Sequence, residues 1–570
     1  MTMLRKLSLA VWIGSIAASS VWAQPNVSDG GILNSASYAS PRLPTGAVAQ
    51  GAIFVIFGVN MGPATLVSAP SLPLGDTLGG TSVRVTSGGQ TLNCPMVYTS
   101  AGQVAAIMPS TTPVGNATLT VTYNGATSVS RNVRVAASSF GTYTINQRGS
   151  GPGVITNFES ATSQPVNTVL KPARPGQTVI LYGTGLGPLP AGTPDNAAAP
   201  AVQINNNNIE VLIGSRRATV SYAGRAPGFV GLDQLNLVVP EGVLGCAVSV
   251  LVRVGTQVSN VTTMAVSQSG GVCSDPLGLP TSVLERVSQG NSVKVGVIGF
   301  ARSALEISIP IIGTTNITND SGVASFIEFT PQNIVASSSL NAQGAPSIGS
   351  CTVFTGSASA LVPDDPLTYG GLDAGASLAV NGPRGTKTMT KSNPFDGSYS
   401  GSFATGGIAI PGAPPADPPF LEPGNYTTTG TGGAQVGAFT AQYTISTPLN
   451  WTNKAAVSTV ARANGQVVTW QPGSANDYVI IYGYSSSDVS ETAIYGVFTC
   501  MERANVGTFT VPAGILLALP ATPAGGGGLG LPLGVFGVGI VNQERSFTAP
   551  GLDYGYSVAT SQSLKSVTYN

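Results

Sequence analysis

Gly51-Ala-Ile-Phe-Val-Ile-Phe-Gly-Val-Asn-Met-Gly-Pro63 is followed further along the chain by a stretch of the same construction, Gly176-Gln-Thr-Val-Ile-Leu-Tyr-Gly-Thr-Gly-Leu-Gly-Pro188. Each is an apolar run of strand-forming residues that ends in a glycine turn and a proline. The spacing between them is the length of one small β-domain. This internal repeat predicts two copies of one β-fold in tandem.

The composition also favours strands. Of 570 residues 73 are Gly and 41 are Pro, and only 8% are charged, where an average domain has about 25%. Helix surfaces depend on Glu, Lys and Arg, so their scarcity favours strands and tight turns. Strands at short spacing with turn signals between them are typical of β-sandwiches.

The first residues have the pattern of an export signal. Arg5 and Lys6 precede the apolar run from Leu7 to Ile16, and Ala23 ends a cleavage-site pattern of small residues. A membrane anchor is the alternative, but a span needs about twenty apolar residues and this run is shorter. We therefore expect a signal peptide removed after Ala23, no transmembrane segment in the mature chain, and a secreted or cell-surface location.

The charge balance excludes two classes of partner. Lys+Arg and Asp+Glu are 24 each, so removal of Arg5 and Lys6 leaves a net charge of −2 (22 − 24). Binding to phosphates requires clustered cations, and the sequence has no basic stripe. We expect neither nucleic acid nor an anionic membrane surface as partner.

The five cysteines suit an oxidising compartment. Cys246 opens a predicted strand and Cys273 follows the last strand of the same sheet, so we expect them to pair. Cys351 and Cys500 would form a second bridge, although connectivity does not follow from sequence alone. Cys94 is left over and is expected to be a small buried residue.

The repeat resembles known domains. The turn Tyr182–Pro188 resembles that of the IPT/TIG type of immunoglobulin-like domain. Asn34-Ser-Ala-Ser-Tyr38, Tyr222-Ala-Gly-Arg-Ala-Pro-Gly-Phe-Val-Gly231 and Gln234-Leu-Asn236 resemble an uncharacterised repeat domain of secreted Solibacter-type acidobacterial proteins. The resemblance covers roughly residues 30 to 275, implies an immunoglobulin-like fold and export, and implies no activity.

We therefore expect an all-β chain of tandem immunoglobulin-like β-sandwiches with a small mixed linking domain. Short helices are predicted in that linking domain near residues 280–287 and 330–336. The expected boundaries are 1–23 for the signal peptide, 24–140 and 141–272 for the two repeats, 273–372 for the linking domain, and 373–447 and 448–570 for two further β-sandwiches.

The chain lacks histidine, which removes Ser-His-Asp and Cys-His catalysis and the commonest metal ligand. Gly183–Gly187 could suggest a phosphate loop, but Pro188 and Pro190 block the helix that such a loop needs. Asp320-Ser-Gly322 is interpreted as a turn because the alternating ligands of a calcium loop are missing. We expect no catalytic residue, no metal and no cofactor.

A pair of carboxylates is the remaining route to an enzyme, since glycoside hydrolysis needs two of them flanking a bond. None of the candidate acids lies in a recognisable motif, and turn formation is the simpler interpretation for each. The alternative function is thus a carbohydrate-active hydrolase in the C-terminal half, with the immunoglobulin-like pair as an accessory module. The candidates are Asp233, Glu241, Asp364, Asp365, Asp373 and Glu422.

The preferred hypothesis is a binding or scaffolding protein whose loops contact a polysaccharide or a protein. The loop with Arg225 and Phe229 and the proline-rich loop 406–423 are the candidate contacts, because they are long and carry apolar or aromatic residues. The first repeat lacks the loop that contains Phe229, so any binding through this loop would belong to the second repeat only. Trp451 and Trp470 are expected to fill sandwich cores.

Overall fold

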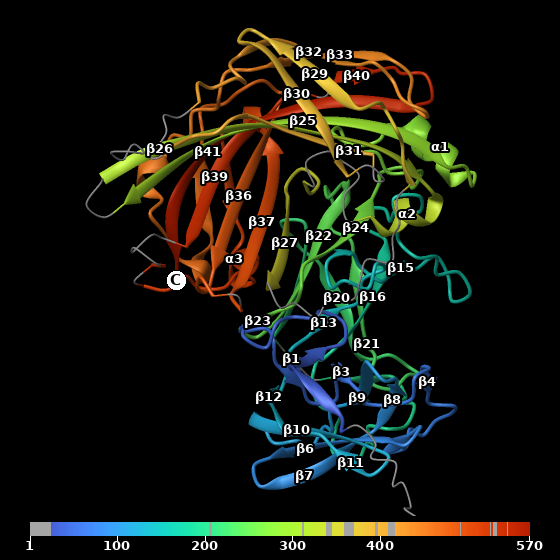
Figure 1. Ribbon diagram of the computed structural model, residues 1–570. Helices are drawn as coiled ribbons and strands as arrows, with labels where there is room; N and C mark the ends of the chain where they lie inside the picture. Colours follow the sequence, from blue (N-terminus) through green and yellow to red (C-terminus); the bar gives the residue numbers. More distant parts are fainter. Residues whose placement is uncertain are drawn as a thin grey trace, which may run out of the picture.

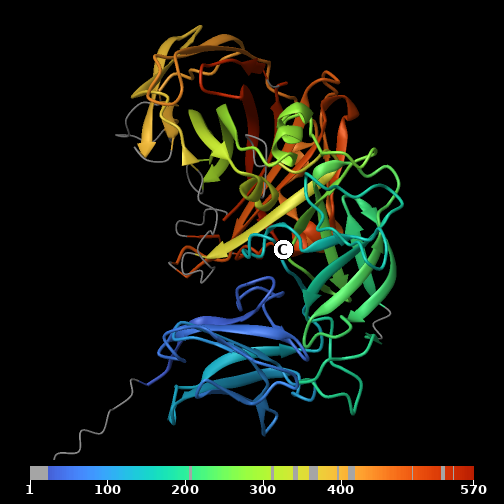
Figure 2. The same cartoon turned by 90° about the vertical axis from the view of Figure 1, so that its right-hand side faces the viewer.

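The computed structural model describes residues 24–204, 208–309, 313–337, 345–357, 370–393, 397–407, 417–490, 492–524, 526–527, 533–543 and 545–570. The expected signal peptide, residues 1–23, lies outside these ranges. The described chain is almost entirely β-structure, as the composition predicts. We call the first repeat (residues 24–140) domain 1, the second (141–272) domain 2, and residues 273–570 the C-terminal half. Domain 2 lies between domain 1 and the C-terminal half (Figures 1 and 2).

Domain 1 is a sandwich of two sheets around one apolar core. The strand that contains residues 81–87 shows the expected alternation of burial, since Val83 and Val85 are buried while Arg84 and Thr86 face solvent. One sheet has the order β1 (Asn26–Asn34), β3 (Ile53–Val59), β9 (Gln103–Ile107), β8 (Met96–Thr99) and β4 (Val67–Ser68). The other has the order β2 (Val48–Ala49), β12 (Arg131–Ala136), β10 (Gly115–Tyr123), β6 (Thr81–Ser87) and β5 (Thr77–Leu78), with β7 (Gln90–Cys94) and β11 (Ala126–Thr127) beside it.

Domain 2 repeats this strand order except at the edge of the second sheet. One sheet is β13 (Gly141–Thr142), β16 (Thr178–Thr184), β21 (Asp233–Val238), β20 (Thr219–Arg225) and β17 (Val202–Gln203), with β15 (Ile155–Asn157) on β16. The other is β14 (Gly151–Pro152), β24 (Thr262–Val266), β22 (Gly245–Val254), β18 (Ile209–Ile213) and β19 (Arg216–Arg217), with β23 (Gln257–Val258) on β22. At that edge β19 follows β18 along the chain, whereas β5 precedes β6. The shared order of the first sheet and of the first four strands of the second confirms the internal repeat, and both copies are immunoglobulin-like sandwiches.

The repeated stretch has positive φ at two matching positions in both copies. Gly51 and Gly176 begin the strand at positive φ, 71° and 78°. After the strand, Asn60 and Gly185 take the left-handed region at φ 58° and 103°, which Asn tolerates and Gly adopts freely. The next residue, Met61 or Leu186, is fully buried. The glycines therefore form a turn that inserts one apolar anchor into each core, and no helix follows.

The C-terminal half is built on one long sheet. Its order is β27 (Ser350–Ser357), β37 (Ile494–Arg503), β36 (Tyr478–Ser486), β39 (Gly534–Val541), β41 (Tyr554–Tyr569), β25 (Val293–Ile309), β26 (Gly313–Phe329), β31 (Ser398–Ala404), β30 (Gly385–Asn393), β29 (Ser377–Gly382), β32 (Gly424–Gly430) and β33 (Phe439–Ile445). β28 (Gly370–Gly371), β34 (Thr459–Val460) and β40 (Arg545–Phe547) add to it, and β35 (Gln466–Thr469) pairs with β38 (Thr508–Val511).

The pairing of β25 with β41 unites this half. The two strands run parallel from Val295 with Tyr554 to Glu306 with Lys565, and β26 then joins β31. Strands from the expected units 273–372, 373–447 and 448–570 thus share one hydrogen-bonded sheet. The domain boundaries within this half stay a prediction that sheet continuity does not decide.

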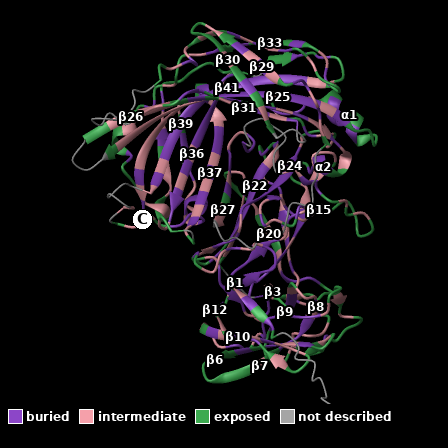
Figure 3. Ribbon diagram, in the orientation of Figure 1, coloured by how far each residue is buried: buried purple, intermediate pink, exposed green. Residues whose placement is uncertain are grey.

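The two largest of the apolar clusters that pack against this sheet lie at different parts of it. One packs under β36, β37 and β39 and contains Trp451 and Trp470, which are 5% and 2% exposed. The expectation that both tryptophans fill a core is therefore confirmed. The other core fills the curl between β25 and β33. Figure 3 shows buried residues along these strands, with exposed ones at the tip of β26 and in β7.

The short helices and the disulfides follow the expectations. The helices are α1 (Thr281–Ser288), α2 (Pro331–Ala336) and α3 (Ala513–Leu517), of which the first two were predicted. Cys246 is bonded to Cys273, and Cys351 to Cys500 across the neighbouring strands β27 and β37. Both pairings are confirmed, and Cys94 is a free, buried residue of the domain 1 core.

Candidate functional site

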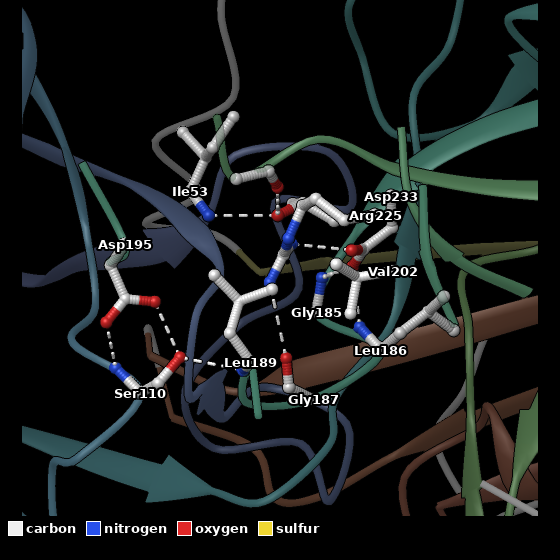
Figure 4. A network of polar contacts seen from close by, with 12 residues as sticks. Ile53, Ser110, Gly185, Leu186, Gly187, Leu189, Asp195, Val202, Arg225 and Asp233 are labelled. Atoms are coloured by element: carbon white, nitrogen blue, oxygen red, sulfur yellow. Dashed lines mark hydrogen bonds and ion pairs between the residues drawn. The ribbon is translucent and has the colours of Figure 1, made fainter. Parts of the chain in front are cut away.

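The sequence singles out the loop that follows β20. Arg225, the last residue of β20, is not at the surface. Arg225 is 1% exposed, and its guanidinium lies 2.5 Å from the carboxylate of Asp233, which is itself fully buried. The other carboxylate oxygen of Asp233 accepts hydrogen bonds from the backbone amides of Gly185 and Leu186, each at 2.7 Å (Figure 4). These four residues form what we call the clasp, because Asp233 holds the glycine turn to the loop.

The candidate contact at Arg225 is therefore wrong. A guanidinium that is buried and paired with a carboxylate cannot reach a partner at the surface, and removing either charge would leave the other unpaired. Burial raises the pKa of Asp233 to about 6, against the lowering effect of Arg225 and of the two amides. The charged residue in the motif stabilises the loop and the turn.

The clasp lies at the junction with domain 1 (Figure 4). The amide of Ile53, the first residue of β3, donates to the Thr184 hydroxyl at 2.9 Å, and that hydroxyl donates to the carbonyl of Gly231 at 2.7 Å. A Cβ at Gly231 would lie 2.5 Å from Ile53 and 2.6 Å from Ile107. Only a glycine allows the loop to approach domain 1 this closely.

Further polar contacts connect the same two domains. The Asn34 side chain donates to the carbonyl of Thr184 in domain 2 at 3.2 Å and, within domain 1, to that of Ser139 at 3.1 Å. Asp195 accepts from the hydroxyl and amide of Ser110 at 2.6 and 2.7 Å. All three quoted motifs, Asn34–Tyr38, Tyr222–Gly231 and Gln234–Asn236, thus lie in or beside one interdomain junction. The contact of Asn34–Tyr38 with the other two motifs could not be predicted, because that motif is far from them in the sequence.

Phe229 is placed as expected of a contact residue. Its side chain is 56% exposed, although the backbone around it is fixed: Phe229 donates to the carbonyl of Ala226 at 3.2 Å, and Gly228 to that of Ala199 at 3.0 Å. The loop therefore presents an exposed ring from a rigid base. Phe229 stays a candidate partner-contact residue.

The second candidate loop, 406–423, is described only at its ends. Phe420 and Leu421 are buried at 2% and 1% exposure, and their amides donate to Asp320 at 2.6 and 2.8 Å. Arg302 binds both oxygens of that carboxylate at 2.8 Å. This end of the loop is held in the core, while residues 408–416 lie outside the described ranges.

The candidate acids have separate partners. Asp233 pairs with Arg225, Asp373 with Lys391, and Glu422 with Arg302 at 3.4 Å. Glu241 lies on the turn before β22, with its carboxylate over Gly176. Asp364 and Asp365 lie outside the described residues. Each of the three paired carboxylates is neutralised by a cation, which is the arrangement of a structural ion pair.

An aromatic row on the C-terminal sheet was not anticipated. The rings of Phe354 and Tyr495 have centroids 6.2 Å apart, and those of Tyr495 and Tyr484 are 6.3 Å apart. Tyr478-Val-Ile-Ile-Tyr482-Gly-Tyr484 contains the signal, because alternate residues of a strand share one face. The long-range pairing of β27 with β37 that completes the row has no such local signal.

Two general features concern ligands and membranes. Within the described ranges, His, Cys, Asp and Glu do not gather in any group of three that could hold a metal ion. Among the described residues, no helix is both long enough and apolar enough to span a bilayer.

Comparison with known proteins gives no close relative. No family model and no curated protein matches the chain. Domains 5–6 of the S-layer protein SbsC match with 14% identity and a TM-score of 0.16, over 43% of this chain and 98% of that one. A Bacteroides ovatus SGBP-B of a mixed-linkage glucan utilization locus, solved with a heptasaccharide, matches with 12% identity and a TM-score of 0.13, over 86% and 98%. The titin Ig tandem A164–A165 matches with 11% identity and a TM-score of 0.11, over 39% and 90%. Scores this low carry no conclusion about this chain.

Proposed function

We propose that this chain is an exported, non-enzymatic binding or scaffolding protein. It contacts a polysaccharide or a protein through loops mounted on its immunoglobulin-like tandem. The observation that carries the proposal is the exposed ring of Phe229 on a loop whose base is fixed by the buried clasp. A rigid mount lowers the entropy lost on binding, so such loops are good contact elements.

The two disulfide bonds support export. Cys246–Cys273 ties domain 2 to the linker, and Cys351–Cys500 joins neighbouring strands of the C-terminal sheet. Structural disulfides persist in oxidising compartments and are rare in the reducing cytosol. The positive start and apolar run at residues 5–16 support the same location.

The test is replacement of Phe229 by Ala in the full chain, with Phe158→Ala as matched control. Phe158 is a second exposed aromatic of domain 2, at 41% exposure. Binding is measured on glycan arrays and by pull-down with cell-envelope material. We expect F229A to weaken binding about tenfold or more, as loss of an aromatic anchor does, and F158A to leave it unchanged. Equal binding by F229A and the wild type would show that the loop is not the contact.

A further inference from the structure

On one face of the C-terminal sheet, three aromatic residues near the β27 edge point away from the core below, while further along the same face Tyr478 is buried in a small cluster with Ile480 and Met501. Val353 of β27 and Phe498 of β37 point into the core below. Successive side chains of a strand point to opposite faces, so Phe354, Tyr495 and Tyr484 lie on the other side. Phe354 is 44% exposed and the two tyrosines are half-buried. The row they form crosses β27, β37 and β36 from strand to strand.

Glycines make this face flat. A Cβ at Gly356 would lie 2.8 Å from both the Cζ and the hydroxyl oxygen of Tyr495, so the ring lies over the bare backbone of β27. In the same way Leu564 lies over Gly537 of β39. A strand glycine often marks a site of close approach. Here two glycines let neighbouring side chains lie flat against the sheet.

The outward residues next to the aromatic row are uncharged in the part that the structure describes; further along the same face, Arg503 of β37 lies over the Tyr478 ring. Lys565 of β41 belongs to the opposite face, where its ammonium group donates to the carbonyls of Lys454 and Ala455. The face therefore combines aromatic and aliphatic surface with hydroxyl groups. We call it the platform; its outward residues are Thr352, Phe354, Tyr482, Tyr484, Tyr495, Val497, Thr499, Val535 and Leu564.

Domain 1 borders one end of the platform. Arg42 reaches the turn between β36 and β37 and pairs with Asp488 at 2.8 Å. Phe354 and Tyr38 of domain 1 line one shared cavity. The platform is thus a sheet face that domain 1 borders at one end. A polymer chain could lie across its strands.

We infer that the platform binds an uncharged polysaccharide. Aromatic rings present an apolar face to the C–H face of a pyranose ring, and the phenol and threonine hydroxyls offer hydrogen-bond partners at its edge. The platform residues themselves carry no charge that would attract an acidic polymer, and Arg42 at the border is paired with Asp488. The platform also lacks the arginines that are enriched at protein interfaces. This inference rests on the proposed binding function and places the ligand on the C-terminal sheet, away from Phe229.

The test is affinity electrophoresis of the full chain in gels that contain β-glucan, mannan or starch, with alginate and pectate as acidic probes. Two platform variants are compared, Tyr484→Ala combined with Tyr495→Ala, and Gly356→Ala, which keeps every aromatic residue but displaces the Tyr495 ring. Phe158→Ala is the matched control for loss of an exposed ring, and Phe229→Ala tests the loop. Near-UV circular dichroism and melting curves check that each variant is folded.

We expect retardation by at least one neutral polysaccharide, weakened about tenfold or more in both platform variants and unchanged in F158A. Neutral binding that survives both folded platform variants and is lost in F229A would overturn the platform while leaving the proposed function in place. Retardation by acidic polymers alone would also overturn it. A wild-type chain that binds neither polysaccharides nor an envelope protein would contradict both proposals, and binding to a protein alone would contradict the platform only.

Discussion

The two copies of the glycine turn have the same local sequence pattern and a left-handed residue at the same position, yet they lie in different surroundings. In domain 2 the turn 183–187 is buried against domain 1 and bound by Asp233. In domain 1 the turn 58–62 lies at the far end of β3, where Val59 is 56% exposed. Gly102 stands opposite Gly58 at the position where Asp233 stands opposite Gly183. One carboxylate and its arginine therefore distinguish a turn that joins two domains from one that only closes a sandwich.

The largest expected effect follows from removing that carboxylate. Asp233→Ala leaves Arg225 buried without its partner, and breaking a buried pair in this way costs about 3–5 kcal/mol. We expect a loss of this size in the free energy of unfolding, measured by chemical denaturation of the full chain. Asp29→Ala removes an exposed acid of domain 1 and should change stability by less than about 0.5 kcal/mol. Equal stability of D233A and the wild type would show that the clasp does not hold the turn.

The next effect concerns close approach between the domains. Gly231→Ala places a Cβ against Ile53 and Ile107 at a residue with φ of 66°. Overpacking of this kind costs about 1–3 kcal/mol. Gly30→Ala is the matched control, since its φ is 65° and nothing lies within 4 Å. We expect small-angle scattering to show a larger radius of gyration for G231A alone. An unchanged envelope for G231A would mean that this contact does not set the domain arrangement.

A smaller effect is expected from exchanging the copies at one position. Thr184 corresponds to Val59 of the first turn, and Thr184→Val would remove the acceptor for the Ile53 amide. An unsatisfied buried donor costs about 1–3 kcal/mol. The reverse exchange, Val59→Thr, changes an exposed residue and should be neutral within about 0.5 kcal/mol. Melting temperatures of both variants provide the measurement, and equal shifts would contradict the difference between the turns.

A further prediction concerns the pH profile, where the pKa shifts of Asp233 and Asp320 should change stability in opposite directions. The pKa of Asp233 is raised to about 6 by burial, above an unfolded value of about 3.9. The folded state thus holds this proton more firmly, and stability falls as pH rises through that interval. Burial opposes ionisation of Asp320 too, but hydrogen bonds from Arg302 and two amides outweigh it and lower its pKa. Its contribution is present above about pH 3.9 and is lost as pH falls.

Unfolding midpoints from about pH 3 to 8 test this difference. We expect Asp233→Asn to abolish the loss of stability that occurs as the pH rises from about 3.9 to about 6. Asp320→Asn should instead remove part of the loss in acid. Identical profiles for the two variants would contradict the assigned directions.

Local sequence determined the repeat, the turns and the strand faces. The alternation in β6, the left-handed residues Asn60 and Gly185, and the short helices α1 and α2 follow from preferences within a few residues. The pairing of Cys246 with Cys273 also followed from their order along predicted strands, whereas Cys351 and Cys500 were only the pair that remained. These features depend on neighbours in the chain, which a sequence displays directly.

Tertiary structure alone decided which residues are available for binding. The sequence places Arg225 in a loop, but in the structure it is buried by the Asp233 carboxylate of the next strand and by the segment at Gly51 of domain 1. The parallel pairing of β25 with β41 and the row from Phe354 to Tyr484 join segments far apart in the chain. Periodicity specifies which way a side chain points from its strand, but not which distant strand lies beside it, because that choice depends on the burial energy of the whole assembled sheet.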